Sequence, residues 1–353
     1  MSYSKKVRIG FVGVGNMGQC AHLKNYATID ECEVVAIAEL RSDLRKKVSQ
    51  RYGVGKTYEN HSDMLASEEL DAIVASQAFN HHGLLLPELL ATGKPVFSEK
   101  PIAASIEVGE KIVQAEKDGG SFLMVGYHKR SDPATMYAKE KIEELRASGE
   151  LGALTYVRIV MPAGDWIAGG FNDMIKSSES IPGTEIDPPP SDMTEDEHKR
   201  YISFVNYYIH QVNLMRHMLG TPYHVKYVDP SEVILAVEGE NGVPGVIEMT
   251  PYSTTIDWQE EILVCFERGY VKLTLPAPVA LNRPGKVEIL HDPKKGETPE
   301  TVAPQLPWVH AMRQQAMNFI SAVRGDSQPL CTAEEALEDL KNAREYYSIL
   351  LGN

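Results

Sequence analysis

The sequence predicts an α/β protein in which a doubly wound parallel sheet, residues 1–127, precedes a second α/β domain, residues 128–353, with a mostly antiparallel sheet. Up to about residue 127, apolar runs alternate with helix-like segments, which is typical of parallel strands covered by helices on both faces. Beyond that point strand-like runs are separated by turn residues alone, which is typical of antiparallel pairing. A length of 353 residues accommodates two domains of ordinary size.

The first domain is expected to alternate strands and helices from its start. The predicted strands cover residues 7–12, 34–39, 72–75, 95–98 and 122–125. The predicted helices follow Gly15, carry Leu44, Val48 and Tyr52, run through 84–90 to end at Gly93, and cover 105–118. A short segment beginning at Asp63 precedes the third strand.

The second domain is expected to contain helices over 134–147, 201–219, 308–324 and 333–350. Its predicted strands lie at 154–161 and near 224–228, 232–238, 245–251, 260–267, 270–275 and 286–290. Residues 164–200 are rich in glycine, proline and acids and are too long for a simple connector, so they are either a lid or interface arm, or a disordered, solvated insertion.

Composition limits the classes of partner. Acidic residues outnumber basic ones, 49 to 35, and a net charge of −14 argues against binding to a nucleic-acid backbone. No apolar stretch reaches the roughly 18 residues that a membrane span requires. The four cysteines lack metal-site spacing, and the adjacent pair His81-His82 would point apart, so no metal site is expected. These features predict a cytoplasmic, enzyme-like protein.

The segment Gly13-Val14-Gly15-Asn16-Met17-Gly18 directly follows the first predicted strand. In this setting the first glycine makes a tight turn, the second lets a pyrophosphate approach, and the third lets helix pack on strand. Glu39 closes the next strand, where a carboxylate accepts hydrogen bonds from an adenosine ribose and repels a 2′-phosphate. The fingerprint predicts a dinucleotide site that prefers NAD to NADP, a preference that Arg41 could soften.

Glu99-Lys100-Pro101 follows a predicted parallel strand, at the sheet edge where open α/β sheets bind ligands. A lysine there would lie beside a nicotinamide, whose positive charge would lower the lysine pKa and suit it to proton transfer. From the residues alone the simpler interpretation is an exposed lysine at a strand end, with Pro101 stiffening the turn.

The helix predicted over 201–219 carries a polar stripe, because Asn206, His210, Asn213 and His217 share one face. Most of its other residues are apolar, so the helix is expected to be buried and its polar groups to need partners. The stripe is either one wall of a substrate pocket, with His210 as acid or base, or a set of hydrogen-bonded core groups.

Three further positions are candidates. The segment Tyr127-His128-Lys129-Arg130 crosses between the domains and either borders a cleft or forms a solvated basic turn. His82 follows the third strand and is placed near the cofactor. Trp166 is the best candidate in the long irregular segment for stacking on a sugar face.

The ordered set of motifs resembles the Gfo/Idh/MocA family: the glycine fingerprint, Glu39, Asn80-His81-His82, Glu99-Lys100-Pro101, the segment 126–133 and a helix with His210 ahead of Leu219-Gly220. The resemblance implies a Rossmann domain, a second domain with a large open sheet used for oligomer contacts, and a tightly held NAD(P). It also implies oxidation or reduction of a sugar or cyclitol hydroxyl, and it favours a catalytic Lys100. In similar proteins this lysine acts with an Asp and with a His four residues later; Lys100 and His210 match, but the Asp position is Asn206.

The predicted catalytic residues are Lys100, His210 and Asn206. The predicted cofactor-binding residues are Gly13, Gly15, Asn16, Met17, Gly18, Glu39, Arg41, Ser76, Gln77, His82, Glu99, Lys100 and His128. The predicted substrate-binding residues are Lys100, Arg130, Trp166, Asn206, Tyr207 and His210.

An amide cannot carry a proton, so His210 is expected to accept the proton of a secondary hydroxyl while Lys100 polarises its oxygen and hydride passes to NAD. The expected partners are a small carbohydrate or cyclitol and further copies of the chain, as a dimer or tetramer. Two alternatives are a redox-neutral glycoside cleavage or elimination through a transient keto-sugar, and a non-catalytic cofactor-binding sensor.

Overall fold

The computed structural model describes residues 5–190, 192–292 and 296–352, and its contacts divide them into two compact units. The first unit contains the described residues up to Tyr127, together with Gly169–His198 and Met312–Leu337. The second contains His128–Ala168, Lys199–Ala311 and the described residues from Glu338 onward. Two segments that follow residue 127 in sequence therefore pack with the first unit, although all residues after 127 were expected in the second domain.

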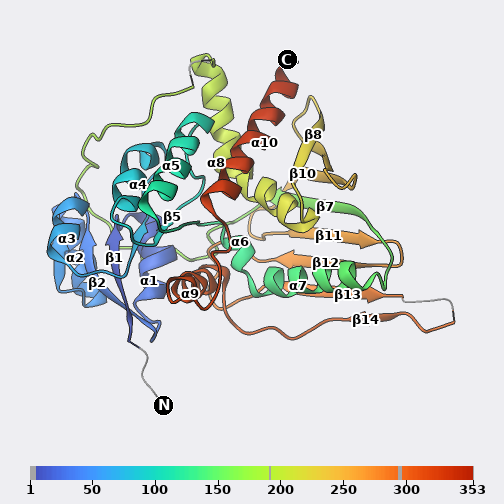
Figure 1. Ribbon diagram of the computed structural model, residues 1–353, viewed down its shortest axis with the longest axis horizontal. Helices are drawn as coiled ribbons and strands as arrows, with labels where there is room; N and C mark the ends of the chain where they lie inside the picture. The colour runs from blue at the N-terminus through green and yellow to red at the C-terminus, as the bar shows by residue number, and fades with distance from the viewer. Residues whose placement is uncertain (1–4, 191, 293–295, 353) are drawn as a thin grey trace. The chain divides into compact units, whose positions relative to one another are not determined.

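The first unit is built on a six-stranded parallel sheet in the order β3-β2-β1-β4-β5-β6 (Figure 1). Its strands are β1 Val7–Val12, β2 Cys32–Ala38, β3 Lys56–Tyr58, β4 Ala72–Ala75, β5 Val96–Ser98 and β6 Leu123–Val125. Because β1 pairs with both β2 and β4, the strand order reverses there, and open α/β sheets bind ligands at the carboxyl ends of strands at such a switch point.

Helices connect these strands and cover the sheet. They are the π-helical turn η1 Gly18–Leu23 with α1 Lys24–Tyr26, then α2 Ser42–Tyr52, α3 His61–Ser67, η2 Phe79–His81, α4 His82–Leu90 and α5 Ile106–Gly119. Helix α9, Ala311–Val323, also joins this core, since the rings of Phe97 and Phe319 lie 5.7 Å apart edge to face. Burial of aromatic and aliphatic side chains on both faces of the strands stabilises the unit.

The second unit is built on an eight-stranded sheet in the order β14-β13-β12-β11-β7-β10-β9-β8, in which only the β7–β10 pair is parallel among the described strands. The strands are β7 Leu154–Ala163, β8 Tyr223–Val228, β9 Ile234–Gly239, β10 Pro244–Ser253, β11 Glu260–Phe266, β12 Gly269–Leu275, β13 Lys286–His291 and β14 Glu300–Val302. The predicted α/β class, with a parallel sheet followed by a large and mostly antiparallel one, is confirmed.

Four helices accompany this sheet in the described part of the chain: α6 His128–Ser131, α7 Pro133–Ser148, α8 Glu195–Leu219 and α10 Ala333–Leu351 (Figure 1). Helix α8 begins six residues earlier than predicted, at a capping box in which Thr194 and Glu197 bond to each other's backbone N–H. Helices α8 and α10 pack through aromatic rings, and Phe204 stacks on Tyr346 with centroids 3.9 Å apart. None of the helices among the described residues combines the length and apolarity of a membrane span.

Candidate functional site

The glycine fingerprint forms a tight turn between β1 and η1. Gly13 has φ +86°, a conformation that side-chain-bearing residues rarely adopt, and its N–H donates to Ala38 O at 2.8 Å. A Cβ on Gly18 would lie 2.5 Å from Gly13 O, so this glycine lets the helix start close to the turn. A Cβ on Gly15 would meet Arg41 Nη2 at 3.6 Å and no other described atom within 4 Å, so the space above Gly15 is open.

Glu39 lies at the end of β2 and is 7% exposed. Its carboxylate accepts the N–H of Val14 at 3.1 Å, the N–H of Arg41 at 3.1 Å and the Nε–H of Arg41 at 2.8 Å. Burial opposes ionisation of Glu39, but the hydrogen bonds from Arg41 and Val14 outweigh it and lower its pKa. A fixed negative charge therefore lies beside the glycine turn, and Arg41 is paired with it.

Ser76 and Gln77 follow β4 and complete the same cluster. The Ser76 N–H donates to Val12 O at 2.9 Å, while its buried hydroxyl has no hydrogen-bond partner among the described residues. The Gln77 amide lies against Gly13, 2.4 Å from where a Cβ would be. The predicted residues Gly13, Gly15, Gly18, Glu39, Arg41, Ser76 and Gln77 are thus brought together at the carboxyl ends of β1, β2 and β4.

Lys100 follows β5 along the same edge of the sheet. It is half-buried, its N–H donates to Glu99 Oε2 at 3.2 Å, and its peptide bond to Pro101 is cis. Glu99 Oε1 forms a hydrogen bond with His22 Nε2 at 2.5 Å. Burial opposes ionisation of Glu99, but the contact with His22 and the charge of Lys100 outweigh it and lower the pKa of Glu99. Glu99 therefore ties the lysine segment to the helix that follows the glycine turn.

His82 begins α4 and is fully buried. Its Nδ1 lies 3.0 Å from Ile102 O, and burial lowers its pKa, so the ring is held neutral and oriented by the backbone. Asn16 and Met17, in contrast, remain accessible at the start of the helix after Gly15. First-turn N–H groups of this kind are free to bind an anion.

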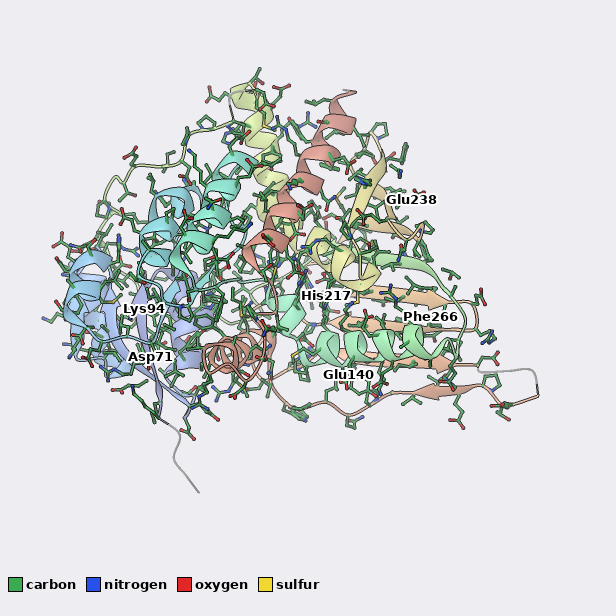
Figure 2. All side chains as sticks on the ribbon, viewed as in Figure 1. Asp71, Lys94, Glu140, His217, Glu238 and Phe266 are labelled. Carbon is green, nitrogen blue, oxygen red and sulfur yellow. The ribbon has the colours of Figure 1, made fainter. Side chains whose placement is uncertain are left out.

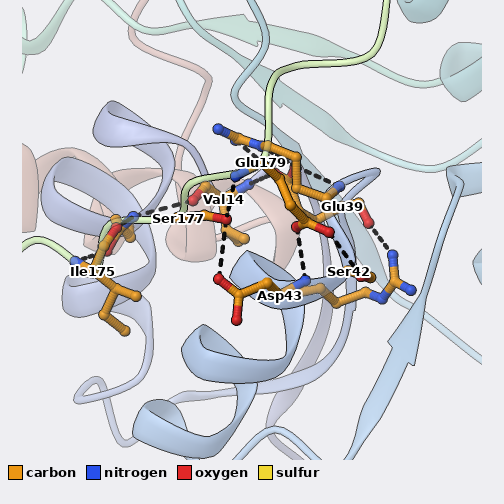
Figure 3. A network of polar contacts seen from close by, with 10 residues as sticks. Val14, Glu39, Ser42, Asp43, Ile175, Ser177 and Glu179 are labelled. Atoms are coloured by element: carbon orange, nitrogen blue, oxygen red, sulfur yellow. Dashed lines mark hydrogen bonds and ion pairs between the residues drawn. The ribbon is translucent and has the colours of Figure 1, made fainter.

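Residues 169–190, called the strap below, contain no helix or strand and are held to the first unit by hydrogen bonds. The Gln19 amide is bonded to both N–H and C=O of Ile175, at 2.8 and 3.1 Å. Farther along, Glu179 bonds the start of α2 (Figure 3). Asp187 Oδ2 accepts the Gly83 N–H at 2.9 Å. Of the two expectations for this region, a disordered insertion does not hold for the strap, because its anchors are specific.

The second unit brings two of the predicted residues into contact. The rings of His128 and His210 meet edge to face with centroids 4.6 Å apart. His128 is buried and His210 is half-buried, whereas Asn206 and Tyr207, one turn earlier on α8, are exposed. Partial burial of the Tyr207 ring raises the pKa of its phenol above the usual value, so the group stays protonated at neutral pH.

The other end of the polar stripe on α8 is structural. Asn213 Oδ1 accepts Arg130 Nε–H at 2.7 Å, and its Nδ2–H donates to Asp339 at 2.6 Å. Asp339 also accepts Arg216 Nη2–H at 2.7 Å. Burial and the charges of Arg130 and Lys139 lower the pKa of His217 well below its usual range (Figure 2 labels this residue). The stripe therefore has accessible groups at one end and hydrogen-bonded core groups at the other, and a substrate pocket at the accessible end stays a prediction.

The segment 127–130 is not a solvated basic turn, because Lys129 and Arg130 are 4% and 3% exposed. Lys129 Nζ is paired with Glu260, which also accepts hydrogen bonds from Gln211 at 2.7 Å and from the Trp258 indole at 3.0 Å. Arg130 is held by Asn213, and Lys129 by Glu260. The two buried cationic side chains therefore have partners on distant elements. Glu260, Gln211 and Asp339 were not predicted, because each stands beside another polar residue in the sequence and looks like an ordinary surface position.

Trp166 lies after β7 and is 38% exposed. Its carbonyl accepts the Val279 N–H at 3.2 Å, which fixes the backbone and leaves part of the indole accessible. Its predicted role in stacking on a sugar stays a prediction, as do the roles of the other site residues.

The comparisons with known proteins agree with this geometry. Residues 7–127 match the model of a family described as an oxidoreductase family with an NAD-binding Rossmann fold. An inositol 2-dehydrogenase from Rubrobacter xylanophilus is 33% identical over 152 residues, which is 42% of this chain and 42% of that protein. A scyllo-inositol 2-dehydrogenase (NAD(+)) from Bacillus subtilis is 24% identical over 71% of this chain and 70% of its own length.

The fold extends beyond these sequence matches. An oxidoreductase from Desulfitobacterium hafniense, described as NADPH-dependent, superposes with a TM-score of 0.74 over 97% of this chain and 94% of its own, at 15% identity. At that identity the likeness shows the fold alone. The sequence match thus spans less than half the length of the first inositol dehydrogenase. Over the second domain, the likeness to the Desulfitobacterium hafniense structure is one of fold.

Proposed function

We propose that this chain, whose residues 7–127 match the Gfo/Idh/MocA oxidoreductase family, is an NAD-dependent dehydrogenase. Its proposed substrate is a secondary hydroxyl of a cyclitol or related sugar. The observation that carries the proposal is the cluster of Gly13, Gly15, Gly18 and Glu39 at the switch point of the first sheet. In this scheme the first unit holds the cofactor, and the second, residues 128–168 and 199–311 with the end of the chain, holds the substrate and other subunits.

The residues present fit a dinucleotide. The open space over Gly15 and the accessible first turn after it suit a pyrophosphate, and the buried Ser76 hydroxyl has a free hydrogen-bonding capacity nearby. Glu39 suits the hydroxyls of an adenosine ribose. Arg41, which could have softened the preference for NAD, already donates two hydrogen bonds to Glu39, and this supports NAD over NADP.

The proposed chemistry uses two side chains, Lys100 and His210. When bound, NAD supplies the hydride acceptor. Lys100 holds the substrate oxygen and stabilises negative charge on it, and His210 accepts the hydroxyl proton. Asn206, which is exposed one turn before His210, hydrogen-bonds a substrate hydroxyl but takes no proton.

A cyclitol is the proposed substrate class because the relatives reported above are named for inositol oxidation. Those names favour net oxidation over the redox-neutral cleavage. Further copies of the chain are the proposed partners: the second unit exposes Tyr252, Ile256 and Trp308, of which Ile256 is 86% and Trp308 83% exposed.

The test is reduction of NAD by purified protein with a panel of inositol isomers and aldoses, followed by absorbance of the reduced nicotinamide. Lys100→Met and His210→Ala should abolish turnover, whereas Lys46→Met and His224→Ala, both exposed, should not. Failure to bind NAD, or turnover that survives Lys100→Met, would refute the proposal.

A further inference from the structure

We propose that Glu179, carried by the strap, is a specificity-determining residue that keeps the 2′-phosphate of NADP out of the cofactor site. The inference rests on the proposed function, and it assigns a second layer of discrimination beyond Glu39. The residue lies 136 positions from the helix on which it acts, in a segment that belongs to no sheet or helix.

The start of α2 is where Rossmann proteins accommodate a 2′-phosphate, because it directly follows the acid at the end of β2. Here Arg41 occupies the position before the helix, and its side chain does not cap it. Glu179 supplies the missing cap: its Oε2 accepts the Asp43 N–H at 2.8 Å and its Oε1 accepts the Ser42 hydroxyl at 2.9 Å. These are the two donors that a phosphate would use, and a carboxylate of this protein already holds them.

Two of the positive charges near the start of α2 are paired with carboxylates, and a third, Arg45, donates to the backbone carbonyl of Glu39. Arg41 is held by Glu39, and Lys47 Nζ lies 2.7 Å from Asp43 Oδ2. Figure 3 shows Glu39, Asp43 and Glu179 gathered around the start of α2. The hydrogen bond from Ser42 lowers the pKa of Glu179, which keeps that carboxylate charged at neutral pH. A dianionic group brought here would meet three carboxylates.

Further hydrogen bonds position the Glu179 carboxylate when the strap is closed. Its own N–H donates to Ser177 Oγ at 3.1 Å, and the Ser177 hydroxyl donates to Asp43 Oδ2 at 3.1 Å (Figure 3). The strap is fixed on the N-terminal side of Glu179 by the two bonds between Ile175 and Gln19. Removing Glu39 alone therefore leaves the phosphate donors occupied and does not produce an NADP-binding protein.

The experiment measures dissociation constants for NAD and NADP by calorimetry on the full chain, with AMP and adenosine 2′,5′-bisphosphate as probes of the adenosine half. Glu179→Gln removes the charge and keeps the size, and we expect it to shift the NADP-to-NAD affinity ratio about tenfold toward NADP. The ratio of the affinities for adenosine 2′,5′-bisphosphate and AMP should shift by the same factor. Glu185→Gln, an exposed acid on the same strap, is the matched control and should leave both ratios unchanged.

The combination with Glu39→Gln sharpens the test, because the double variant should gain more NADP affinity than either single variant. Thermal unfolding of each variant shows whether the fold is retained. If Glu179→Gln is folded and binds NAD but keeps the wild-type ratio, this inference is wrong and the proposed function stands. If the wild-type chain binds neither dinucleotide, both are wrong.

Discussion

Substitution of the three fingerprint glycines by alanine should separate the demands of the fold from those of the ligand. Gly13 and Gly18 are required by the chain itself, through a positive φ at Gly13 and through the approach of Gly18 to Gly13 O. Gly15 has no such requirement, since an added Cβ there would have Arg41 Nη2, at 3.6 Å, as its one described neighbour within 4 Å. If Gly15 serves a bound pyrophosphate, its substitution should cost affinity and leave stability intact.

The magnitudes follow from these contacts. Gly13→Ala forces an L-residue into the left-handed region, about 1–2 kcal/mol, and also presses on the Gln77 amide, so about 2–3 kcal/mol is expected in total. Gly18→Ala overpacks backbone against backbone and should cost about 1–3 kcal/mol. Gly15→Ala should change the free energy of unfolding by less than about 1 kcal/mol, and in the stabilising direction. Its methyl group, however, should weaken NAD binding about 10–100-fold.

Urea unfolding and calorimetric NAD titration on the same preparations measure both quantities. Gly53→Ala, at the positive-φ end of α2 with open space around it, controls for backbone strain remote from the turn. Gly15→Ala with wild-type NAD affinity would refute a phosphate at this turn. Gly15→Ala as unstable as Gly13→Ala would show instead that the fold itself needs the space above Gly15.

Three further predictions concern catalysis and buried charge. Lys100→Met and His210→Ala should lower kcat at least about 100-fold and leave NAD affinity unchanged. Steady-state kinetics measure kcat and NAD titration measures the affinity; parallel losses of both would contradict the proposed roles. Asp339→Ala removes a partner of the buried Arg216 and should lower the free energy of unfolding in urea by about 3–5 kcal/mol, and an effect below about 1 kcal/mol would count against the network. Burial raises the pKa of Asp132 to about 6, so the folded state retains the proton better than the unfolded chain and stability falls as pH rises from about 4 to 6. Asp132→Asn should remove that slope, at most about 3 kcal/mol, in urea titrations at pH 4 and pH 7.5; an unchanged slope would show that other groups cause it.

Local patterns were sufficient to predict five of the six strands in the sheet of the first unit. Ala72–Ala75 is apolar throughout, and Val7–Val12 is apolar except for Arg8, because helices cover both faces of the sheet; glycines mark the turns. Two short strands escaped prediction, Lys56–Tyr58 and Glu300–Val302. Both are edge strands of three residues with little buried surface, so their pairing leaves almost no apolar signal in the sequence.

In the candidate site, too, some residues could be placed from local sequence patterns and others could not. The residues that a local motif fixes, from Gly13 to Glu39 and at Lys100, could be predicted because the motif states their spacing. Partners brought from distant segments could not: Glu260 neutralises Lys129, and Glu179 reaches α2 from 136 residues away. Such contacts depend on tertiary packing, and the acids involved look like ordinary surface residues in the sequence.

If Glu179 acts as proposed, cofactor choice depends on the position of the strap. It is anchored at the starts of η1, α2 and α4, which follow β1, β2 and β4, so its anchors span the edge of the sheet where a dinucleotide lies in the proposed function. Those anchors are a few hydrogen bonds, and the ones made by Glu179 are exposed to solvent, whereas the sheet is held by a buried apolar core. Local opening of the strap therefore costs far less free energy than unfolding of the unit. Because the Glu179 carboxylate reaches α2 only when the strap is closed, the proposed rejection of a 2′-phosphate depends on the closed strap.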